Sequence, residues 1–172
     1  MIYILLIGFS LFTMDSTMTY SISNKLNSSF SDVVFKTATR SANRESILLY
    51  SALFTLLGDS SDISNQKGAI FGGALTSGLC VLIKYVTDRK RPTGTTSRWN
   101  SSFPSGHAEM SAFIAVYFGE KYPRYRIPLY IWALLVGTSR IYLKRHWLSD
   151  VISGYALGGL GAYVTLRCYH RG

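Results

Sequence analysis

Charged residues are scarce in this chain. They make up 16% of its 172 residues, well below the roughly 25% that is usual in soluble globular domains. Tyr, Phe and Trp together reach 14%. A chain that is poor in charge and rich in aromatic side chains is typical of a protein that contacts a membrane.

Linkers and cysteines are also nearly absent. No stretch rich in Pro, Gly and Ser divides the chain, so we expect residues 1–172 to form a single domain. The two cysteines, Cys80 and Cys168, each lie in an apolar segment and have no metal-ligand spacing around them. We interpret both as packing residues rather than as a disulfide or a metal site.

No uncharged run reaches the roughly 20 residues that cross the hydrocarbon core of a bilayer. Six shorter runs are present, and most continue into a turn whose ionisable residues can reach the membrane surface or line a polar cavity. We therefore predict an all-α integral membrane bundle of six helical spans; hydropathy alone leaves the buried helices of a soluble bundle open. The runs cover residues 1–14, 46–58, 68–83, 110–119, 127–139 and 151–166.

The first run is predicted to be a retained helix. It lacks the basic start of a signal peptide, and Asp15 follows it in place of a small-residue cleavage site. Beyond it, apolar residues recur every four positions, which predicts an amphipathic interfacial helix between spans one and two. A solvated loop is the alternative. The recurring residues are Met18, Ile22, Leu26, Phe30 and Val34.

Acidic residues are few: nine Asp and Glu stand against eighteen Lys and Arg, which gives a formal net charge of +9. Such an excess suits nucleic acid, an anionic membrane surface or an anionic substrate. Eight of the eighteen cations lie in two short windows, Lys84–Arg98 and Arg140–Arg145, each beside an apolar run. This local clustering favours the capture of an anion and argues against nucleic acid as a partner.

Three clusters of reactive side chains lie at the ends of the runs. In the first, KYVTDRKRP, Lys84 and Arg91 are seven residues apart, which is close to two helical turns, and Pro92 ends the helix. We therefore expect both cations on one face of that helix. Taken alone, the cluster is also typical of a positively charged membrane flank.

The second cluster, FPSGHAEMS, is predicted to begin a helix. Pro104 suits the helix start, Ser105 and Gly106 leave backbone N–H groups uncovered, and His107 stands beside them. The free N–H groups and the dipole of a helix N-terminus both favour an anion. A lone histidine here would also fit a helix cap or an interface.

The third cluster, SRIYLKRHWLSD, joins Arg140 to His146 and Asp150. The four-residue spacing of His146 and Asp150 puts them on one face of a helix. A carboxylate that accepts a hydrogen bond from one ring nitrogen leaves the lone pair of the other nitrogen free to attack. If the spans alternate in direction, all three clusters meet on one side of the membrane.

Together, the three clusters resemble the signature of the type 2 phosphatidic acid phosphatase family. The resemblance covers residues 84–150 and implies a membrane lipid phosphatase that acts on a phosphomonoester or a diphosphate. Among the small bacterial members, lipid A 1-phosphate is the implied substrate, with phosphatidylglycerophosphate and undecaprenyl diphosphate as alternatives. The matching residues are Lys84-x6-Arg91-Pro92, Pro104-Ser105-Gly106-His107 and Ser139-Arg140-x5-His146-x3-Asp150.

The resemblance also implies a role for each residue. His146 would be the nucleophile, Asp150 would orient it, and His107 would protonate the leaving oxygen. This scheme needs no metal and no other cofactor. The residues that would hold the phosphoryl oxygens are Lys84, Arg91, Ser105, Gly106 and Arg140.

Selectivity for a headgroup would come from the loop of residues 93–103. Arg98 and Trp99 are its candidate substrate contacts, as a second anion contact and an interface aromatic, although either would also serve as a membrane anchor.

The resemblance implies a multi-pass protein of the bacterial inner membrane whose active site faces the periplasm or exterior. By the positive-inside rule, the Lys and Arg residues of the loops would place the site in the cytoplasm. The cations near the site are discounted, because they have a substrate to bind. The expected partners are the lipid substrate and the bilayer, with no obligatory protein partner. A membrane protein that only binds anionic headgroups is the competing hypothesis, and it leaves His146 and Asp150 unexplained.

Overall fold

The chain folds into helices throughout the computed structural model, which describes residues 2–43, 46–47, 60–94 and 97–169. These residues contain no strand, so the all-α prediction is confirmed. The elements are α1 (Ile2–Lys25), α2 (Ser29–Ser41), α4 (Ser60–Thr87), α5 (Gly106–Lys121), α6 (Arg126–Tyr142) and α7 (Leu148–Tyr169), with two 3-10 turns, η1 (Arg98–Asn100) and η2 (Pro123–Tyr125).

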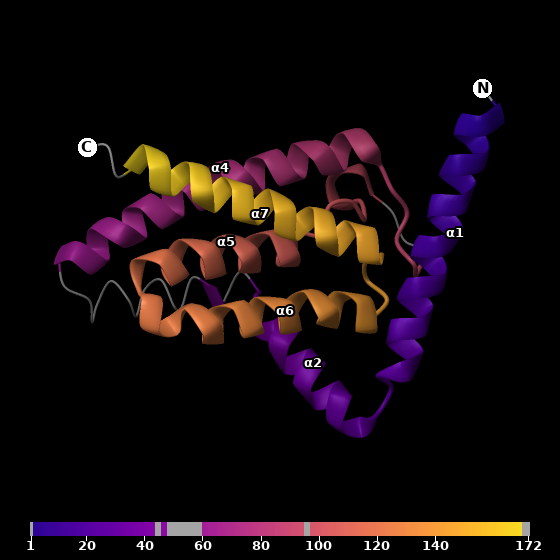
Figure 1. The fold of residues 1–172 in the computed structure, drawn as a ribbon, viewed down its shortest axis with the longest axis horizontal. Helices are drawn as coiled ribbons and strands as arrows, with labels where there is room; N and C mark the ends of the chain where they lie inside the picture. Colours follow the sequence, from indigo (N-terminus) through magenta and orange to yellow (C-terminus); the bar gives the residue numbers. More distant parts are fainter. Residues whose placement is uncertain (1, 44–45, 48–59, 95–96, 170–172) are drawn as a thin grey trace.

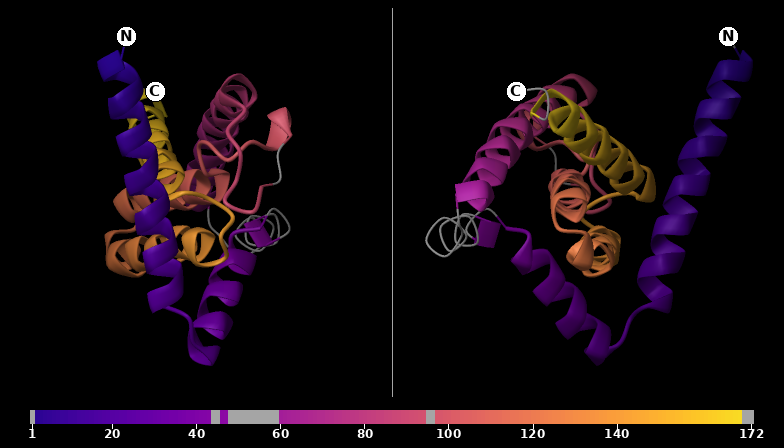
Figure 2. Two further views of the ribbon diagram at one scale, coloured as in Figure 1. Left: turned by 90° about the vertical axis from the view of Figure 1, so that its right-hand side faces the viewer. Right: turned by 60° about the vertical axis from the view of Figure 1, so that its left-hand side comes forward.

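Helices α4, α5, α6 and α7 form a bundle in which successive helices run in opposite directions (Figure 1). Helix α5 contacts all three of the others, while α2 packs against α6. Helix α1 crosses one end of the bundle at a steep angle, and its N-terminal part stands away from the other helices (Figure 2). The ends of α4 and α6 and the starts of α5 and α7 therefore gather at the end that α1 crosses.

The last four uncharged runs lie within α4, α5, α6 and α7, and the first lies within α1. Most of the second run, residues 48–58, lies outside the described residues. Among the described helices, one stretch, Ile63–Thr87, is long and apolar enough to cross a membrane by its length and composition. The prediction of six spans therefore stays a prediction.

The bundle is apolar on its outside and carries polar side chains within. Buried polar residues include Thr76, Lys84, Glu109 and Asp150. A surface covered by large apolar side chains fits a lipid environment better than water. The exposed apolar side chains of α4, α6 and α7 include Phe71, Leu75, Leu82, Val86, Ile127, Ile131, Leu134, Ile152, Leu160 and Val164.

Glycines allow α7 to pack closely on α4. A Cβ atom at Gly72 would lie 2.1 Å from Oγ1 of Thr165, and one at Gly161 would lie 2.2 Å from Oγ1 of Thr76. Each helix thus places a glycine opposite a threonine of the other. Both threonine hydroxyls donate to the carbonyl four residues earlier in their own helix, so they are satisfied without water.

The predicted amphipathic helix differs from the observed one in its bounds. Helix α1 continues to Lys25, and α2 starts anew after Ser28, whose hydroxyl accepts from the Ser31 N–H at 3.1 Å. This N-cap begins a new helix, so the four-residue apolar pattern crosses a break. Within α2, Phe35 and Ala38 are the buried residues.

The two cysteines are free and differ in burial. Cys80 is buried within the bundle, as predicted for a packing residue, whereas Cys168 is exposed near the end of α7. The interpretation of Cys168 as a packing residue was wrong, because its side of the helix faces outward.

The contact between α5 and α7 provides a test of this packing. A Cβ atom at Gly158 would lie 2.0 Å from the Glu109 carbonyl oxygen, which is backbone and cannot move aside. We expect Gly158→Ala to lower the free energy of unfolding by about 1–3 kcal/mol through overpacking, measured as a lower melting temperature in detergent.

Gly159→Ala is the matched control, because the nearest atom to its Cβ would be Val116 Cγ2 at 4.0 Å. Equal melting temperatures for the two variants would contradict the proposed close approach of α7 to α5.

Candidate active site

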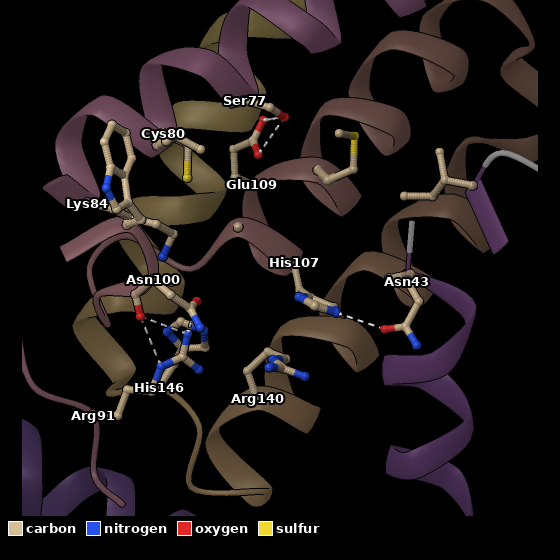
Figure 3. A pocket seen from close by; sticks show the side chains of 16 residues that line it. Asn43, Ser77, Cys80, Lys84, Arg91, Asn100, His107, Glu109, Arg140 and His146 are labelled. Atoms are coloured by element: carbon tan, nitrogen blue, oxygen red, sulfur yellow. Dashed lines mark hydrogen bonds between the residues drawn. The ribbon is translucent and has the colours of Figure 1, made fainter. Parts of the chain in front are cut away.

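The three clusters line one cavity at the end of the bundle that α1 crosses (Figure 3). Its volume is about 640 Å³. Three of the expected site residues, Arg98, Ser105 and Asp150, do not line it. The expected residues that do line it are Lys84, Arg91, Trp99, Gly106, His107, Arg140 and His146.

Lys84 reaches the cavity from the last turn of α4 and is 7% exposed. Its ammonium donates to the carbonyl oxygens of Ser101 at 2.9 Å and Pro104 at 2.5 Å. An ammonium has three protons, so one donor remains beyond these two. Lys84 therefore anchors the loop before α5 and can still contact an anion.

Arg91 does not share a helix with Lys84. Helix α4 ends at Thr87, and Asp88 has a φ of 43°, a left-handed conformation that stops the helix before Pro92 is reached. The predicted helical face is thus wrong, and the loop brings Arg91 to the cavity instead. There it donates to Oδ1 of Asn100 at 2.7 Å, and burial together with the charge of Arg145 lowers the pKa of Arg91.

Helix α5 starts where the sequence predicted a helix, with Ser105 as its N-cap and Pro104 just outside. The prediction that the Ser105 N–H is uncovered was wrong, because it donates to the Asp150 carbonyl at 2.9 Å. The Ser105 side chain is fully buried, yet it makes no capping bond, and its Oγ has no hydrogen-bond partner within the described residues. The first N–H groups of a helix also lack intrahelical partners. Of these first residues, Gly106 and His107 line the cavity.

Arg140 contributes a second unpartnered donor. One of its terminal nitrogens donates to Oγ1 of Thr39 at 2.5 Å, while its buried Nε has no partner in the described part of the chain. Buried polar atoms without partners are costly. A tetrahedral anion beside Arg140 in the cavity would give its Nε an acceptor.

His146 lies in the loop between α6 and α7, two residues before α7 begins at Leu148. Its Nδ1 is 2.7 Å from the Ser102 carbonyl oxygen and 3.6 Å from Oδ2 of Asp150. The prediction that His146 and Asp150 share one face of a helix is wrong, because α7 begins only after His146. Because a carbonyl only accepts, Nδ1 carries the proton, and Nε2 keeps its lone pair.

Burial keeps the His146 ring neutral. It lowers the pKa of His146 to about 4, although the nearby Asp150 carboxylate opposes the shift. The lone pair of Nε2 is therefore available at physiological pH.

Asp150 holds the segments around His146 together. Its carboxylate accepts from the Ser102 hydroxyl, from the Trp147 N–H at 2.8 Å and from Arg89 at 2.6 Å. The Asp150 carbonyl also accepts from the Ser105 N–H at 2.9 Å. Asp150 thus acts on His146 mainly through Ser102, whose carbonyl holds the ring.

Helix α1 adds polar contacts that our sequence analysis missed. Asp15 accepts from Arg89 at 2.7 Å and from the Ser149 N–H at 3.0 Å. Thr19 accepts from the Leu148 N–H, and Ser23 donates to the Tyr142 carbonyl, both at 3.0 Å. Asp15, Thr19 and Ser23 recur every four residues, so they share one face of α1. This polar spacing could have indicated the face of α1 that contacts the site.

Helix α2 and the residues after it reach the site from another side. Thr39 binds Arg140, and Oδ1 of Asn43 is 3.2 Å from Nε2 of His107. Nothing in the sequence between the first two runs marked Thr39 or Asn43 as site residues. Their contacts arise only when α2 packs against α6.

The loop after α4 places its two candidate residues differently. Trp99 is 67% exposed at the cavity and contacts the Tyr85 ring, with centroids 4.6 Å apart. Arg98 forms an ion pair with Asp88 at 3.5 Å and does not line the cavity. Of the two, Trp99 is the one in place to meet a ligand.

Among residues 2–43, 46–47, 60–94 and 97–169, no three His, Cys, Asp or Glu side chains gather as a metal ion would require. The expectation that the site uses no metal stays a prediction.

Fold and site together define an all-helical protein in which three cations and two histidines line one cavity at one end of a bundle. The model of the PAP2 superfamily matches residues 67–172, which is more than half of the chain. The chain therefore belongs to the PAP2 superfamily, and this confirms the resemblance found in the three clusters.

Curated relatives match part of the chain. A lipid A 1-phosphatase from Porphyromonas gingivalis is 38% identical over 101 residues, covering 56% of this chain and 21% of the relative. A lipid A 1-phosphatase from Rhizobium etli is 41% identical over 71 residues, covering 41% of this chain and 30% of the relative. The chain thus spans less than a third of the length of these relatives.

Solved structures share the fold. The crystal structure of Aquifex aeolicus LpxE superposes with a TM-score of 0.77 at 21% identity, covering 88% of this chain and 93% of that one. The transmembrane PAP2-type phosphatidylglycerolphosphate phosphatase from Bacillus subtilis gives a TM-score of 0.75 at 20% identity, covering 94% and 87%. Both show that this chain shares their helical fold.

The unpartnered donors predict that a tetrahedral oxyanion stabilises the folded protein. At a concentration one hundred times its dissociation constant, orthovanadate should add about 2.7 kcal/mol to the free energy of unfolding, seen as a rise in melting temperature in detergent. Arg140→Gln should lose this rise, because the guanidinium that faces the cavity is gone.

Arg124→Gln is the control, since Arg124 lies on the exposed turn η2 at the other end of the bundle. An equal rise in both variants would place the anion elsewhere.

Proposed function

We propose that this chain is an integral-membrane lipid phosphatase whose substrate is lipid A 1-phosphate. The observation that carries the proposal is Arg140, whose buried Nε has no partner among the described residues and which lines the same cavity as His146. The relatives named lipid A 1-phosphatase support the choice of substrate.

The cavity supplies what phosphoryl transfer requires. The transferred group carries negative charge on its equatorial oxygens, and fixed positive charges and N–H donors stabilise it without rearranging. Lys84, Arg91 and Arg140 provide the charges, and Ser105 Oγ with the Gly106 N–H completes the set.

The first step is an attack by Nε2 of His146 on phosphorus. A P–N bond forms, the P–O bond to the lipid breaks, and the electron pair stays on the lipid oxygen. The Ser102 carbonyl accepts a hydrogen bond from Nδ1–H. This bond stabilises the positive charge that the ring gains in the resulting phosphohistidine.

His107 moves the protons in both steps. Its Nε2–H donates to Oδ1 of Asn43, so Nδ1 serves the reaction. The ring acts in its cationic form, which gains its second proton when the anionic substrate binds, and Nδ1–H gives that proton to the departing lipid oxygen. In the second step the same nitrogen takes a proton from water as the water oxygen attacks phosphorus. The P–N bond then breaks and inorganic phosphate is released, so His107 and His146 return to their starting states.

The site lies at one end of the bundle, which suits a substrate whose phosphate stays at the membrane surface while its tails remain among lipids. We assign this end to the periplasmic or exterior face of the bacterial inner membrane. The apolar outside of α4, α6 and α7 then faces the acyl chains.

Two alternatives remain to be compared with this proposal. Phosphatidylglycerophosphate or undecaprenyl diphosphate could be the substrate of the same cavity, and the fold shared with the Bacillus subtilis enzyme favours testing the former. A protein that binds anionic lipid without turnover would use the same cations but would have no need of a neutral, oriented His146.

The test is phosphate release by the purified protein in detergent from four lipids: lipid A, phosphatidylglycerophosphate, phosphatidic acid and undecaprenyl diphosphate. We expect the highest kcat/KM with lipid A and no loss of rate when EDTA is added. His146→Ala should remove turnover by at least about a thousandfold, because no phosphohistidine can form.

Rapid acid-free quenching with radiolabelled substrate should trap label on the wild-type protein and none on His146→Ala. Full activity in that variant would refute the mechanism. Lipid binding without any turnover in the wild type would refute the phosphatase.

The contacts of Arg89 generate a further expectation. Arg89→Gln removes the cation between Asp15 and Asp150, which frees Asp150 and Ser102 and misplaces the His146 ring. We expect kcat to fall at least about tenfold with KM little changed, because the cations that bind the phosphate stay in place.

Arg89→Lys should recover only part of kcat, since an ammonium lacks the fork that reaches both carboxylates. Arg124→Gln controls for the loss of one positive charge. A change in KM alone would show that Arg89 acts on binding and would contradict this role.

A further inference from the structure

One buried carboxyl group in the cavity has no part in the proposed chemistry. Glu109 lies in the first turn of α5 and is 1% exposed, yet it lines the cavity together with His107. Figure 3 shows its side chain directed toward Ser77 of α4, away from Arg91, Arg140 and His146. A carboxyl group does not stabilise a phosphate, so Glu109 in this cavity suits a different part of the ligand.

The hydrogen-bonding capacity of Glu109 is only partly used. Within the described residues its donor is the Ser77 hydroxyl, which lies 3.3 Å from Oε1 and 3.2 Å from Oε2. A hydroxyl has one proton, whereas a carboxyl group has several acceptor sites in either protonation state. At least one oxygen of Glu109 is therefore free to accept another bond, and a buried group in this state gains from a donor.

Along α4, the pair lies farther from the end of the helix than Lys84 does. Ser77 precedes Lys84 by seven residues on α4, which is about 10 Å along the helix axis. Cys80, Val81 and Met110 line the same part of the cavity with apolar surface. With the phosphate at Lys84 and Arg140, this part would hold the portion of the lipid next to the phosphoester.

We propose that Glu109 and Ser77 form a recognition subsite that accepts a hydrogen bond from the lipid. The donor is a hydroxyl or amide N–H a few bonds from the phosphoester oxygen. The proposal rests on the proposed phosphatase function and narrows its substrates to lipid phosphates that carry such a donor, over diacylglycerol phosphates, whose chains are joined by esters without one.

The selectivity follows from the apolar surroundings of the pair. A polar site that is built to pair with a substrate donor rejects an analogue without it, because the site's own group is then buried unpaired. The side chains of Val81 and Met110, which line the cavity beside the pair, offer no hydrogen-bond donor in the substrate's place.

The test compares two defined substrates in one detergent preparation. Short-chain ceramide 1-phosphate carries an amide N–H and a hydroxyl beside its phosphate, and phosphatidic acid of equal chain length carries neither. Glu109→Met removes the acceptor at similar volume, and we expect its kcat/KM for the ceramide substrate to fall about tenfold more than that for phosphatidic acid. Glu109→Gln keeps one acceptor oxygen. Its ratio of kcat/KM for the ceramide substrate to kcat/KM for phosphatidic acid should therefore stay close to that of the wild type.

Ser77→Ala should shift the ratio in the same direction by a smaller factor, because the carboxyl group loses the contact that holds it. Ser111→Ala is the control: its hydroxyl is buried on the same helix but donates to the Ala108 carbonyl, and the ratio should not change. If Glu109→Met does not fold, Glu109→Gln and Ser77→Ala still decide the question.

Equal loss on both substrates, or an unchanged ratio in every variant, would overturn the subsite while leaving the phosphatase intact. Absence of turnover on both substrates and on lipid A in the wild type would instead overturn the proposed function.

Discussion

The buried carboxylate of Asp150 joins the segments that make the site. Its oxygens bind Arg89 of the loop after α4, Ser102 of the loop before α5 and the Trp147 N–H. A charge in the interior costs several kcal/mol unless it is paired and hydrogen-bonded, so these partners are held where the carboxylate needs them. The loop that carries His146 takes its conformation from this one constraint.

The rest of the cavity depends on contacts between elements that are distant in the sequence. The Ser102 carbonyl holds the His146 ring, Asp15 of α1 holds Arg89, and Thr39 of α2 holds Arg140. Each of these hydrogen bonds occupies one donor of a side chain of the site. What remains toward the cavity is a set of donors and one ring nitrogen that only a ligand can satisfy.

Much of the site was predictable because its residues lie at helix ends with distinctive spacing. The start of α5 at Ser105 and Gly106 follows from local chemistry, since a serine before a glycine and an apolar run begins a helix. The helical relations assumed for Lys84 with Arg91 and for His146 with Asp150 failed, because α4 stops at Thr87 and α7 starts only at Leu148. In both cases loops produced the proximity that a helix had been expected to produce.

The sequence by itself determined the helical class, the family and the identity of the residues around the cavity, because apolar runs and motif spacing are local properties of the chain. Only the tertiary structure decided which group orients His146, that α1 and α2 support the site, and that Glu109 lies in its wall. Those relations join residues up to 134 positions apart, as between Asp15 and Ser149. Contacts of that kind depend on how helices pack, which no local pattern encodes.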